Sequence, residues 1–404
     1  MQSDVLLKRI LRCQRGLIMM KVQLLLGSGV SIPSGVPSVD DITKSLLNST
    51  WSRDPFIRYQ QGECSWSTNT SRFSASPEQY LLSKVRDIND SIHKQSHFGR
   101  STTYEDVMFL ILLMRSRILG REIPLRVQRL LGEKEFIELK KQLAKAIANY
   151  EACSLGKTVR EVEFLDLCER FIHEAVRNLL SKEVKPIGLE FVEQIVMDKE
   201  LHSLTIATLN HDTLMEDFLS SRSIAYDDGF ETTDSHNHFA PRHLLTGKVR
   251  LLKLHGSIDW FEDDEGNVVR CDEGNELQLR DKNDPFRLPF RFLCGSENKT
   301  DLYEDEPFIT IHSQWSRLLE EAELMVISGY GGCDAKINDA IRNFVQVYVG
   351  KVVILHQEAE LIEERIFNSS ADRAIDPVRH PGILHVNKWM QDCHWDEVKR
   401  EIEN

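Results

Sequence analysis

The hydrophobic pattern of this chain changes twice, and the changes divide it into three parts. Near the N-terminus, the apolar run 24–26 predicts the end of a buried strand, because glycines follow it at once at Gly27 and Gly29. Helical and irregular patterns then predominate up to about residue 200. Beyond that point, predicted strands lie at 202–208, 249–254, 324–328, 351–355 and 382–386. Because several of them are followed by helical patterns, notably 334–348, the fold class is predicted to be α/β with a Rossmann-like parallel sheet.

The middle part is predicted to be a large helical insertion into this sheet domain. Residues 50–200 offer no set of strands for a parallel sheet, and an independent helical domain is the alternative. Residues 1–49 are expected to supply an N-terminal amphipathic helix, the first strand and its glycine turn, and 201–404 the remainder of the sheet domain. Within that remainder, 262–307 is acidic and turn-rich, with a predicted hairpin turn at 264–267, and is expected to form a small, mostly β subregion.

Local signals give more detail about the helices. Thr102 and Glu105 have the spacing of a capping box, and an apolar helix is predicted after them over 107–119. The polar and aromatic stretch 48–100 is expected to be irregular, with short helices. Further helices are predicted over 40–47, 125–150, 160–181 and 188–199.

Composition limits the functional classes. With 404 residues, of which 41% are hydrophobic, the chain is long enough to bury a sizeable core. The net charge of −13 argues against a broad nucleic-acid-binding surface, which needs clustered Lys and Arg. The longest apolar run, 107–114, is too short to span a bilayer, so no membrane partner is expected. Eight cysteines without a Cys-x-x-Cys pair are typical of reduced thiols and a cytoplasmic location.

Four short motifs follow predicted strands. In the first, Gly27, Ser28 and Gly29 are followed by Ser31 and by the sequence SGVP at 34–37. The others are TLNHDTL at 208–214, KLHGSIDW at 253–260 and ISGYGGCD at 327–334. An open parallel sheet binds its ligand beyond the carboxyl ends of its strands, and a glycine turn there is where the pyrophosphate of a dinucleotide lies against backbone N–H groups.

Each motif also has a purely structural interpretation. Asn210 and Asp212 are placed to cap a helix that begins near Thr213. A lone histidine such as His255 is more often structural than catalytic, although Gly256 beside it leaves room for the close approach of a ligand. The glycine turns are also compatible with ordinary strand-to-helix connections. Four motifs in this order together favour a ligand site over these alternatives.

In their order the four motifs resemble those of the sirtuin superfamily. The turn at 27–31 and the SGVP sequence are similar to the Gly-Ala-Gly-Ile-Ser and Ser-Gly-Ile-Pro of its nucleotide loop, and 208–214 is similar to its Thr-Gln-Asn-Ile-Asp-x-Leu. His255 followed by Gly256 resembles its catalytic signature. The continuation SIDWF at 257–261 resembles a bacterial sirtuin-like family of antiviral defence rather than the lysine deacylases. The resemblance does not extend to the middle part of the chain.

This resemblance implies that the chain binds NAD and cleaves the bond between nicotinamide and ribose. It implies catalytic roles for Asn210, which would position ribose or water, and for His255, because imidazole titrates near neutral pH and can act as a base. The residues implied to contact the nucleotide are Gly27, Ser28, Gly29, Ser31, Pro37, Asp212, Gly256, Ser328 and Gly329.

Two departures from the deacylase pattern favour water as the acceptor. Deacylases hold zinc between two Cys-x-x-Cys pairs, whereas only Cys271 and Cys294 lie in the corresponding interval, so no zinc is expected. The Asp-Phe-Arg that follows Gly-Ile-Pro in deacylases is replaced here by Ser-Val-Asp at 38–40. The chain is therefore expected to hydrolyse NAD to nicotinamide and ADP-ribose. The alternatives are a non-catalytic module that senses NAD or ADP-ribose, and an NAD-dependent protein deacylase or ADP-ribosyltransferase.

The resemblance also implies regulation. An enzyme that hydrolyses free NAD in the cytoplasm would exhaust a shared cofactor, so its activity has to be gated by something that binds two states differently. In the families that the chain resembles, a helical domain self-associates and is controlled by a partner such as a HerA/FtsK-type ring ATPase or a short Argonaute. A homo-oligomer with contacts through 50–200, acting in antiviral defence by NAD depletion, is therefore expected.

Overall fold

Two compact units make up the protein. The computed structural model describes residues 19–47, 52–53, 66–67, 76–95, 102–121, 131–153, 158–232, 237–240, 247–263, 265–271, 290–293, 305–367 and 382–403. The first unit, here called the sheet unit, comprises Met1–Val36, Glu183–Phe292 and Leu302–Asn404. The second, the helical unit, comprises Pro37–Lys182 and Leu293–Asp301. The predicted N-terminal helix lies outside the described residues.

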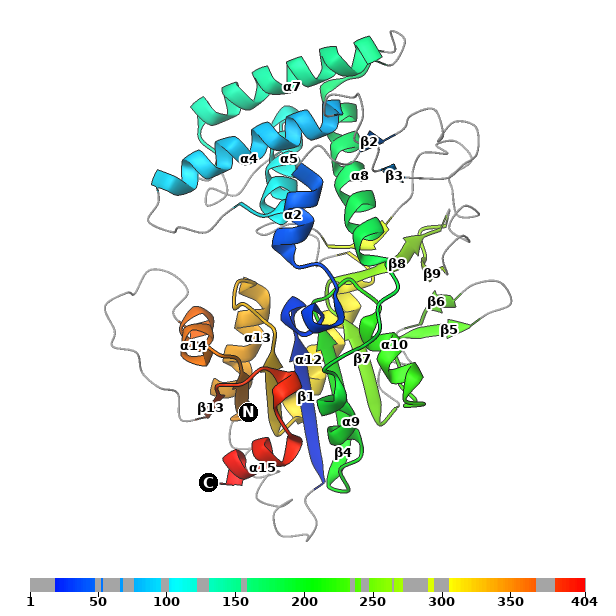
Figure 1. The fold of residues 1–404 in the computed structure, drawn as a ribbon, viewed down its shortest axis with the longest axis vertical. Coiled ribbons are helices and arrows are strands. Elements are labelled where there is room, and N and C mark those ends of the chain that lie inside the picture. The colour runs from blue at the N-terminus through cyan, green and yellow to red at the C-terminus, as the bar shows by residue number, and fades with distance from the viewer. Residues whose placement is uncertain are drawn as a thin grey trace. The chain divides into compact units, whose positions relative to one another are not determined.

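A six-stranded sheet forms the centre of the sheet unit (Figure 1). Its order is β13-β12-β11-β1-β4-β7, and every neighbouring pair is parallel. The strands are β1 (Met20–Leu26), β4 (Leu201–Thr208), β7 (Val249–Lys253), β11 (Leu324–Ser328), β12 (Lys351–Leu355) and β13 (Ile383–Val386). The predicted α/β fold with a Rossmann-like parallel sheet is confirmed. After β1, the chain adds β4 and β7 on one side of β1, and it later adds β11, β12 and β13 on the other side. The direction in which strands are added therefore reverses at the β1–β11 pair.

The core of the sheet unit explains why the strands could be found in the sequence. Leu25, Ala207 and Met325 pack in one cluster with Trp315 and Ile341 from two helices. The neighbouring positions of β1 are buried as well, so both faces of this strand are covered and its apolar run is continuous. The helices of the unit are α9 (Glu190–Val196), α10 (Leu214–Ser221), α12 (Phe308–Glu321), α13 (Ala335–Gln346), α14 (Ala359–Phe367) and α15 (Trp395–Glu403), with short 3-10 turns η1 (Ser28–Val30), η2 (Ile32–Ser34) and η5 (Met390–Asp392).

A second, antiparallel sheet extends the sheet unit. It has five strands in the order β10-β8-β9-β6-β5. They are β5 (Phe230–Thr232), β6 (Asn237–Phe239), β8 (Gly256–Glu262), β9 (Val268–Arg270) and β10 (Phe290–Phe292). Within the predicted β subregion 262–307, the described residues include β9 and β10, whereas 272–289 and 294–304 lie outside the described residues. The strands β5 and β6, and all of β8 except Glu262, lie outside that interval. In a strand of three residues, the alternation of apolar and polar positions is too short to be recognised in the sequence. Such strands are identified only by their pairing in the structure.

Helices dominate the helical unit. They are α2 (Val39–Leu47), α4 (Pro77–Gln95), α5 (Tyr104–Ile118), α7 (Glu133–Cys153) and α8 (Glu161–Leu180), beside a two-stranded antiparallel pair of β2 (Ser52–Arg53) and β3 (Trp66–Ser67). The helix predicted over 160–181 is confirmed. The prediction that 48–100 has only short helices is wrong, because α4 is 19 residues long. Its buried stripe includes Leu81, Leu82 and Val85, and the polar residues around them hid this helical face in the sequence.

The capping box of α5 lies one residue later than predicted. Thr103, not Thr102, is the N-cap, and it pairs reciprocally with Asp106 rather than Glu105. Both pairs have the same spacing, so only the geometry separates them. The Thr102 hydroxyl is instead used in hydrogen bonds with Asn89 and Asp90.

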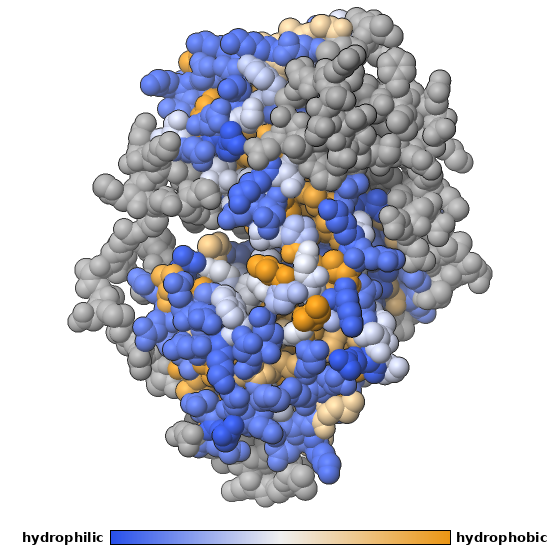
Figure 2. Space-filling view, viewed as in Figure 1, coloured by the Kyte–Doolittle hydropathy of each residue, from blue (hydrophilic) through white to orange (hydrophobic). Residues whose placement is uncertain are grey.

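None of the described helices has the length and apolarity needed to cross a bilayer. On the face shown in Figure 2, hydrophilic side chains cover most of the lower part, in keeping with the high charge content of the sequence. The large apolar side chains that are exposed on the sheet unit are Met19, Ile32, Ile187, Met197, Ile309, Val347 and Val349.

Candidate functional site

The four sequence motifs meet at one edge of the parallel sheet. The glycine turn follows β1, Asn210 follows β4, His255 follows β7 and Gly329 follows β11. These are four adjacent strands of one sheet, and all run in the same direction. The four motifs therefore lie along one edge of the sheet. The four segments that form this edge, here called the edge loops, are 27–31, 208–212, 254–257 and 328–334.

The glycines of two edge loops allow close contact between backbones. The N–H of Gly27 donates to the Ser328 carbonyl at 3.0 Å, and the N–H of Gly29 donates to the Gly329 carbonyl at 3.1 Å. An added Cβ at Gly27 would lie 2.4 Å from the Gly329 oxygen, and one at Gly29 would lie 2.8 Å from the Gly329 Cα. Gly329 itself has a φ of 66°, which favours glycine. These glycines are thus required by the contact between the loops that follow β1 and β11.

Most amides of the first edge loop are used within the protein. Besides Gly27 and Gly29, the N–H groups of Val30 and Ser31 donate to the carbonyls of Gly27 and Ser28. None of these four bonds, all between described residues, uses the N–H of Ser28. The shape of this turn is therefore already fixed by its own hydrogen bonds before any ligand phosphate binds to it.

The glycine requirement leads to a matched prediction. Gly27→Ala is expected to lower the free energy of unfolding by about 1 to 3 kcal/mol, because the new Cβ has no space beside the backbone of Gly329. Gly331→Ala is the control, since an added Cβ there meets no heavy atom within 4 Å; it is expected to change stability by about 0.5 kcal/mol or less. Urea unfolding of both variants measures the difference. Equal unfolding midpoints would contradict the packing described here.

Asn210 connects the loop after β4 with the loop after β1. Its Nδ2 donates to the Gly27 carbonyl at 3.2 Å and to Ser31 Oγ at 2.9 Å, while its own N–H donates to Thr208 Oγ1 at 3.1 Å. Asp212, in contrast, accepts from the N–H of Leu214 at 3.1 Å, where α10 begins. Asp212 therefore accepts from the first N–H of α10, although the N-cap residue itself is Thr213, whereas Asn210 makes no such bond to the helix among the described contacts. Burial of the Asn210 side chain, which is 8% exposed, makes its orientation well defined.

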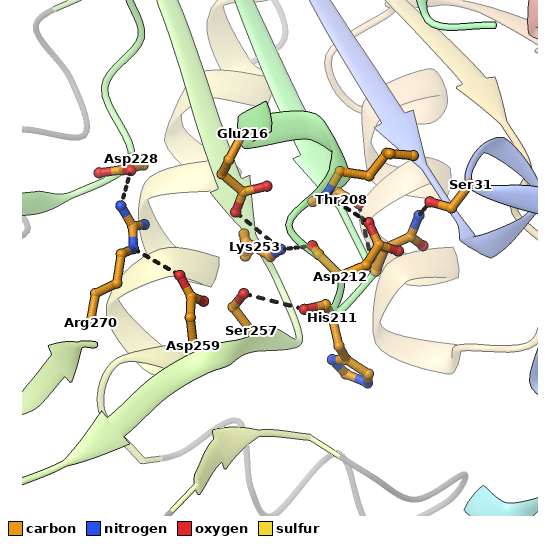
Figure 3. Close-up of polar contacts among 12 residues, drawn as sticks. Ser31, Thr208, His211, Asp212, Glu216, Asp228, Lys253, Ser257, Asp259 and Arg270 are labelled. Carbon is orange, nitrogen blue, oxygen red and sulfur yellow. Dashed lines mark hydrogen bonds and ion pairs between the residues drawn. The ribbon is translucent and has the colours of Figure 1, made fainter. Parts of the chain in front are cut away.

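A buried lysine holds the same loop from the neighbouring strand. The Nζ of Lys253, at the end of β7, donates to the backbone carbonyl of Asp212 and lies 3.1 Å from Glu216 Oε1 (Figure 3). Burial raises the pKa of Glu216, and the charge of Lys253 opposes this rise. The hydroxyl of Ser257 adds a further bond to the His211 carbonyl at 3.2 Å. Sequence analysis missed Lys253, although a single charge at the end of an apolar strand was a usable signal.

His255 lies between the two sheets, in the turn that joins β7 and β8. Its Nε2 is 3.1 Å from Asp334 Oδ2, and the two side chains are 4% and 9% exposed. Gly256 has a φ of 77°, and an added Cβ there would lie 2.3 Å from the carbonyl oxygen of Arg291 in β10. The room that was expected for a ligand beside Gly256 is therefore filled by a backbone strand. The ring of His211 is also near, with its centroid 6.2 Å from that of His255.

A second buried histidine fixes the backbone before His255. His312 of α12 lies with Nε2 3.1 Å from the Leu254 carbonyl. Burial, followed by the positive charge of Lys336 and the proximity of His255, lowers the pKa of His312 to about 3. His312 is therefore neutral near pH 7, and its Nε2 carries the hydrogen that the carbonyl accepts.

This lowered pKa predicts a loss of stability in acid. An unfolded histidine takes up a proton near pH 6.5, whereas folded His312 does so only near its pKa of about 3. The unfolded state therefore binds more protons between these values, and the stabilisation is complete above pH ~6.5 and is lost as the pH falls. At pH 5 the loss should be about 2 kcal/mol.

The measurement compares the wild type with His312→Gln, which keeps an N–H donor for Leu254 and does not titrate. Urea unfolding at pH 7.5 and pH 5 should show a smaller drop for the variant. Parallel pH dependence in the two proteins would contradict this assignment.

Other polar groups near the site serve the second sheet. Arg270 pairs with Asp228 at 2.7 Å and with Asp259 at 3.2 Å (Figure 3). Burial disfavours the charge of Arg270, but the two carboxylates outweigh burial and raise its pKa. This arrangement stabilises β9 against β8 and the segment before β5.

The remaining predicted site residues are placed as follows. The hydroxyl of Ser328 lies 3.5 Å from the Leu355 carbonyl, and Pro37 is the first residue of the helical unit. Cys271 is buried, whereas Cys294 lies outside the described residues. Within the part of the chain that the structure describes, no group of three or more His, Cys, Asp or Glu side chains is arranged to hold a metal ion.

The fold defines an α/β protein, and the edge loops lie at the carboxyl edge of its parallel sheet. Residues 204–375 match the family model of the SIR2-like domain. The match includes Asn210, His255 and Gly329. No curated protein matches the sequence.

Comparison with solved structures gives low scores over nearly the whole chain. A Sir2 homologue mutant in complex with 2'-O-acetyl ADP ribose is 12% identical with a TM-score of 0.39, and covers 97% of this chain and 96% of its own. A structure from a study of sirtuin substrate affinity is 12% identical with a TM-score of 0.36 and coverage of 98% for both chains. A Sir2 homologue–NAD complex is 11% identical, with a TM-score of 0.37 and coverage of 95% and 90%. Because these scores are low, the fold assignment depends on the sheet order itself.

Proposed function

We propose that this chain is an NAD⁺ hydrolase that cleaves the nicotinamide–ribose bond and releases nicotinamide and ADP-ribose. The observation that carries the proposal is the placement of Asn210 and His255. They follow the adjacent parallel strands β4 and β7, both are buried, and Asn210 is bonded to the glycine turn after β1. The SIR2-like match to residues 204–375 supports NAD as the substrate.

The chemistry needs only groups that the edge loops supply. Water attacks ribose C1′ while the bond from C1′ to the nicotinamide nitrogen breaks, and the bonding electron pair returns to the nicotinamide ring. The proton lost by the attacking water goes to His255, and Asn210 orients the ribose or the water. Because a neutral imidazole can take this proton near pH 7, no metal is needed for the step.

Binding of the nucleotide would use backbone more than side chains. The pyrophosphate would lie at the turn of 27–31, where the N–H of Ser28 takes no part in the four backbone bonds described above. Ser31, Pro37, Asp212, Gly256, Ser328 and Gly329 are proposed as the further contacts. At Gly256 any contact would be to the backbone, since β10 fills the side-chain position.

One assay separates this proposal from its alternatives. Purified protein is incubated with NAD, with and without an acyl-lysine peptide, and released nicotinamide, ADP-ribose and protein-bound ADP-ribose are measured. Nicotinamide and ADP-ribose formed without the peptide support the hydrolase. Release only with the peptide would indicate a deacylase, transfer of ADP-ribose to protein an ADP-ribosyltransferase, and tight binding without release an NAD or ADP-ribose sensor.

The same preparation tests the expectation about zinc. Elemental analysis should find no stoichiometric zinc, because two isolated cysteines cannot complete a tetrahedral site. One tightly bound zinc per chain would revive the deacylase alternative.

We further propose that the hydrolase is gated and acts in antiviral defence by NAD depletion. The physical reason is the cost of an ungated enzyme to the cytoplasmic NAD pool, and gating requires a partner that binds two states with different affinity. The proposed assembly is a homo-oligomer with contacts through 50–200, controlled by a HerA/FtsK-type ATPase or a short Argonaute. Mass in solution and NAD loss, measured for the chain alone and with its genomic neighbour, test this. A monomer with constant, partner-independent hydrolysis would defeat it.

A further inference from the structure

Asp334 uses its two carboxylate oxygens for two different partners. Oδ1 accepts from the N–H groups of Lys336 and Ile337 at 3.0 and 3.1 Å, which makes Asp334 the N-cap of α13. Oδ2 lies 3.1 Å from Nε2 of His255, which is 79 residues away in the sequence. A helix cap alone would need only the first of these contacts. The second contact directs a buried carboxylate at the proposed catalytic histidine.

The loop that carries Asp334 is held by its own network. The N–H of Asp334 donates to the Tyr330 hydroxyl at 3.0 Å, and that hydroxyl donates to Asn338 Oδ1 at 2.7 Å. Asn338 Nδ2 in turn donates to the Gly332 carbonyl at 3.0 Å. Burial raises the pKa of Tyr330 well above its usual value, so the hydroxyl keeps its proton and stays a donor. The carboxylate is therefore held in place independently of His255.

The charge around Asp334 favours its ionised form. Asp334 lies at the positive end of the α13 dipole, and the N–H groups that donate to its side chain stabilise a carboxylate. An ionised carboxylate can only accept hydrogen bonds, so the hydrogen between the two side chains belongs to Nε2 of His255. With Nε2 protonated in the neutral ring, the basic lone pair is on Nδ1. Among the described residues, the titratable groups that face this pair include His211, whose ring lies 6.2 Å from that of His255, and His312, which interacts electrostatically with His255, Asp334 and Lys336.

We propose that Asp334 is the positioning residue of His255, and that it holds the imidazole in the Nε2–H form with Nδ1 as the basic nitrogen. The catalytic part of this inference rests on the proposed hydrolase function, whereas the tautomer does not. A carboxylate that fixes the tautomer of a catalytic histidine can matter greatly, because the wrong tautomer presents a hydrogen where the reaction needs a lone pair.

The main variant that tests this keeps the helix cap. In Asp334→Asn, Oδ1 can still cap α13, since Asn is as good an N-cap as Asp, while Nδ2 becomes a donor toward His255. The expected result is a reversal of the bond, with His255 shifted to the Nδ1–H form. Asp334→Ala removes both contacts and should give a mixture of tautomers. Thr103→Ala is the control, because it removes the N-cap of α5 in the helical unit and leaves His255 untouched.

The first readout is independent of activity. ¹⁵N NMR of histidine-labelled protein, with the His255 signal assigned by its loss in His255→Gln, reports the tautomer directly. The wild type and Thr103→Ala should show Nε2–H, and Asp334→Asn should show Nδ1–H. An Nδ1–H signal in the wild type, or an unchanged signal in Asp334→Asn, would overturn the proposal.

The second readout is kinetic. Asp334→Asn should lower kcat for NAD cleavage by about 10- to 100-fold with little change in KM. In a His255→Gln background it should have no further effect, because it acts through His255. An additional loss in that background would show that Asp334 acts by another route. A wild type that shows the Nε2–H signal but cleaves no NAD, either alone or with its genomic neighbour, would support the tautomer assignment and overturn the proposed function instead.

Discussion

Asn210→Ala is expected to lower the rate of NAD cleavage by at least ~10²-fold, the low end for the loss of a positioned acid–base group. The buried Nδ2 of Asn210 donates to Gly27 O and Ser31 Oγ, so the side chain is already oriented in the absence of substrate. Alanine removes the amide that would orient ribose or water. It also removes two hydrogen bonds, and the expected loss of stability is about 1 kcal/mol for each. The measurement is nicotinamide release at saturating NAD.

Two controls separate chemistry from folding in this variant. Asn267→Ala removes an exposed asparagine that bonds to Asp263 in the turn between β8 and β9, and it should keep wild-type turnover. Urea unfolding should show that Asn210→Ala remains folded at the assay temperature. A folded Asn210→Ala protein with near wild-type turnover would remove Asn210 from the proposed mechanism.

His255→Ala is expected to have an effect of similar size, again at least ~10²-fold on NAD cleavage. No other side chain is proposed to take the proton of the attacking water. His255 is 3% exposed, so replacing it with alanine leaves a cavity, and the side chains around this cavity can rearrange. His255→Gln, which fills more of that space, should show the same loss of turnover with a smaller loss of stability.

The control for this variant is another histidine of the same unit. His202 is exposed near the start of β4, at the opposite end of that strand from Asn210. His202→Ala should therefore leave both turnover and stability unchanged. If the His255 variants fold and still release nicotinamide at the wild-type rate, the proposed base is wrong, whatever the status of Asn210.

The sequence was most informative where both faces of an element are covered. β1, β11 and β12 read as short continuous apolar runs, because neither face of these strands meets water. The glycine turn after β1 was equally visible, since a glycine is the only residue that permits the contact with Gly329. The sequence was less informative for α4, where three buried apolar positions are spread among polar residues.

The candidate site was recognised from its motifs, but the structural roles of some of its residues were not. Gly256 was interpreted as space for a ligand, whereas the structure fills that space with the backbone of Arg291. Asp212 and Asn210 looked equivalent as helix caps, and of the two only Asp212 accepts from the first N–H of α10 among the described contacts. In each case the partner lies on a different strand or loop, so local sequence could not distinguish the two roles.

By itself the sequence determined the class of the fold, the positions of the main strands and the four loops that follow them, because these depend on residues that are neighbours along the chain. The tertiary structure decided which side chains meet. Lys253 reaches the loop of Asp212, and Asp334 reaches His255, because β7, β4, β1 and β11 are adjacent in the sheet and their carboxyl ends share one edge. Strand order is set by burial summed over the whole core. The local sequence around two residues that are far apart in the chain therefore does not show that their strands are neighbours.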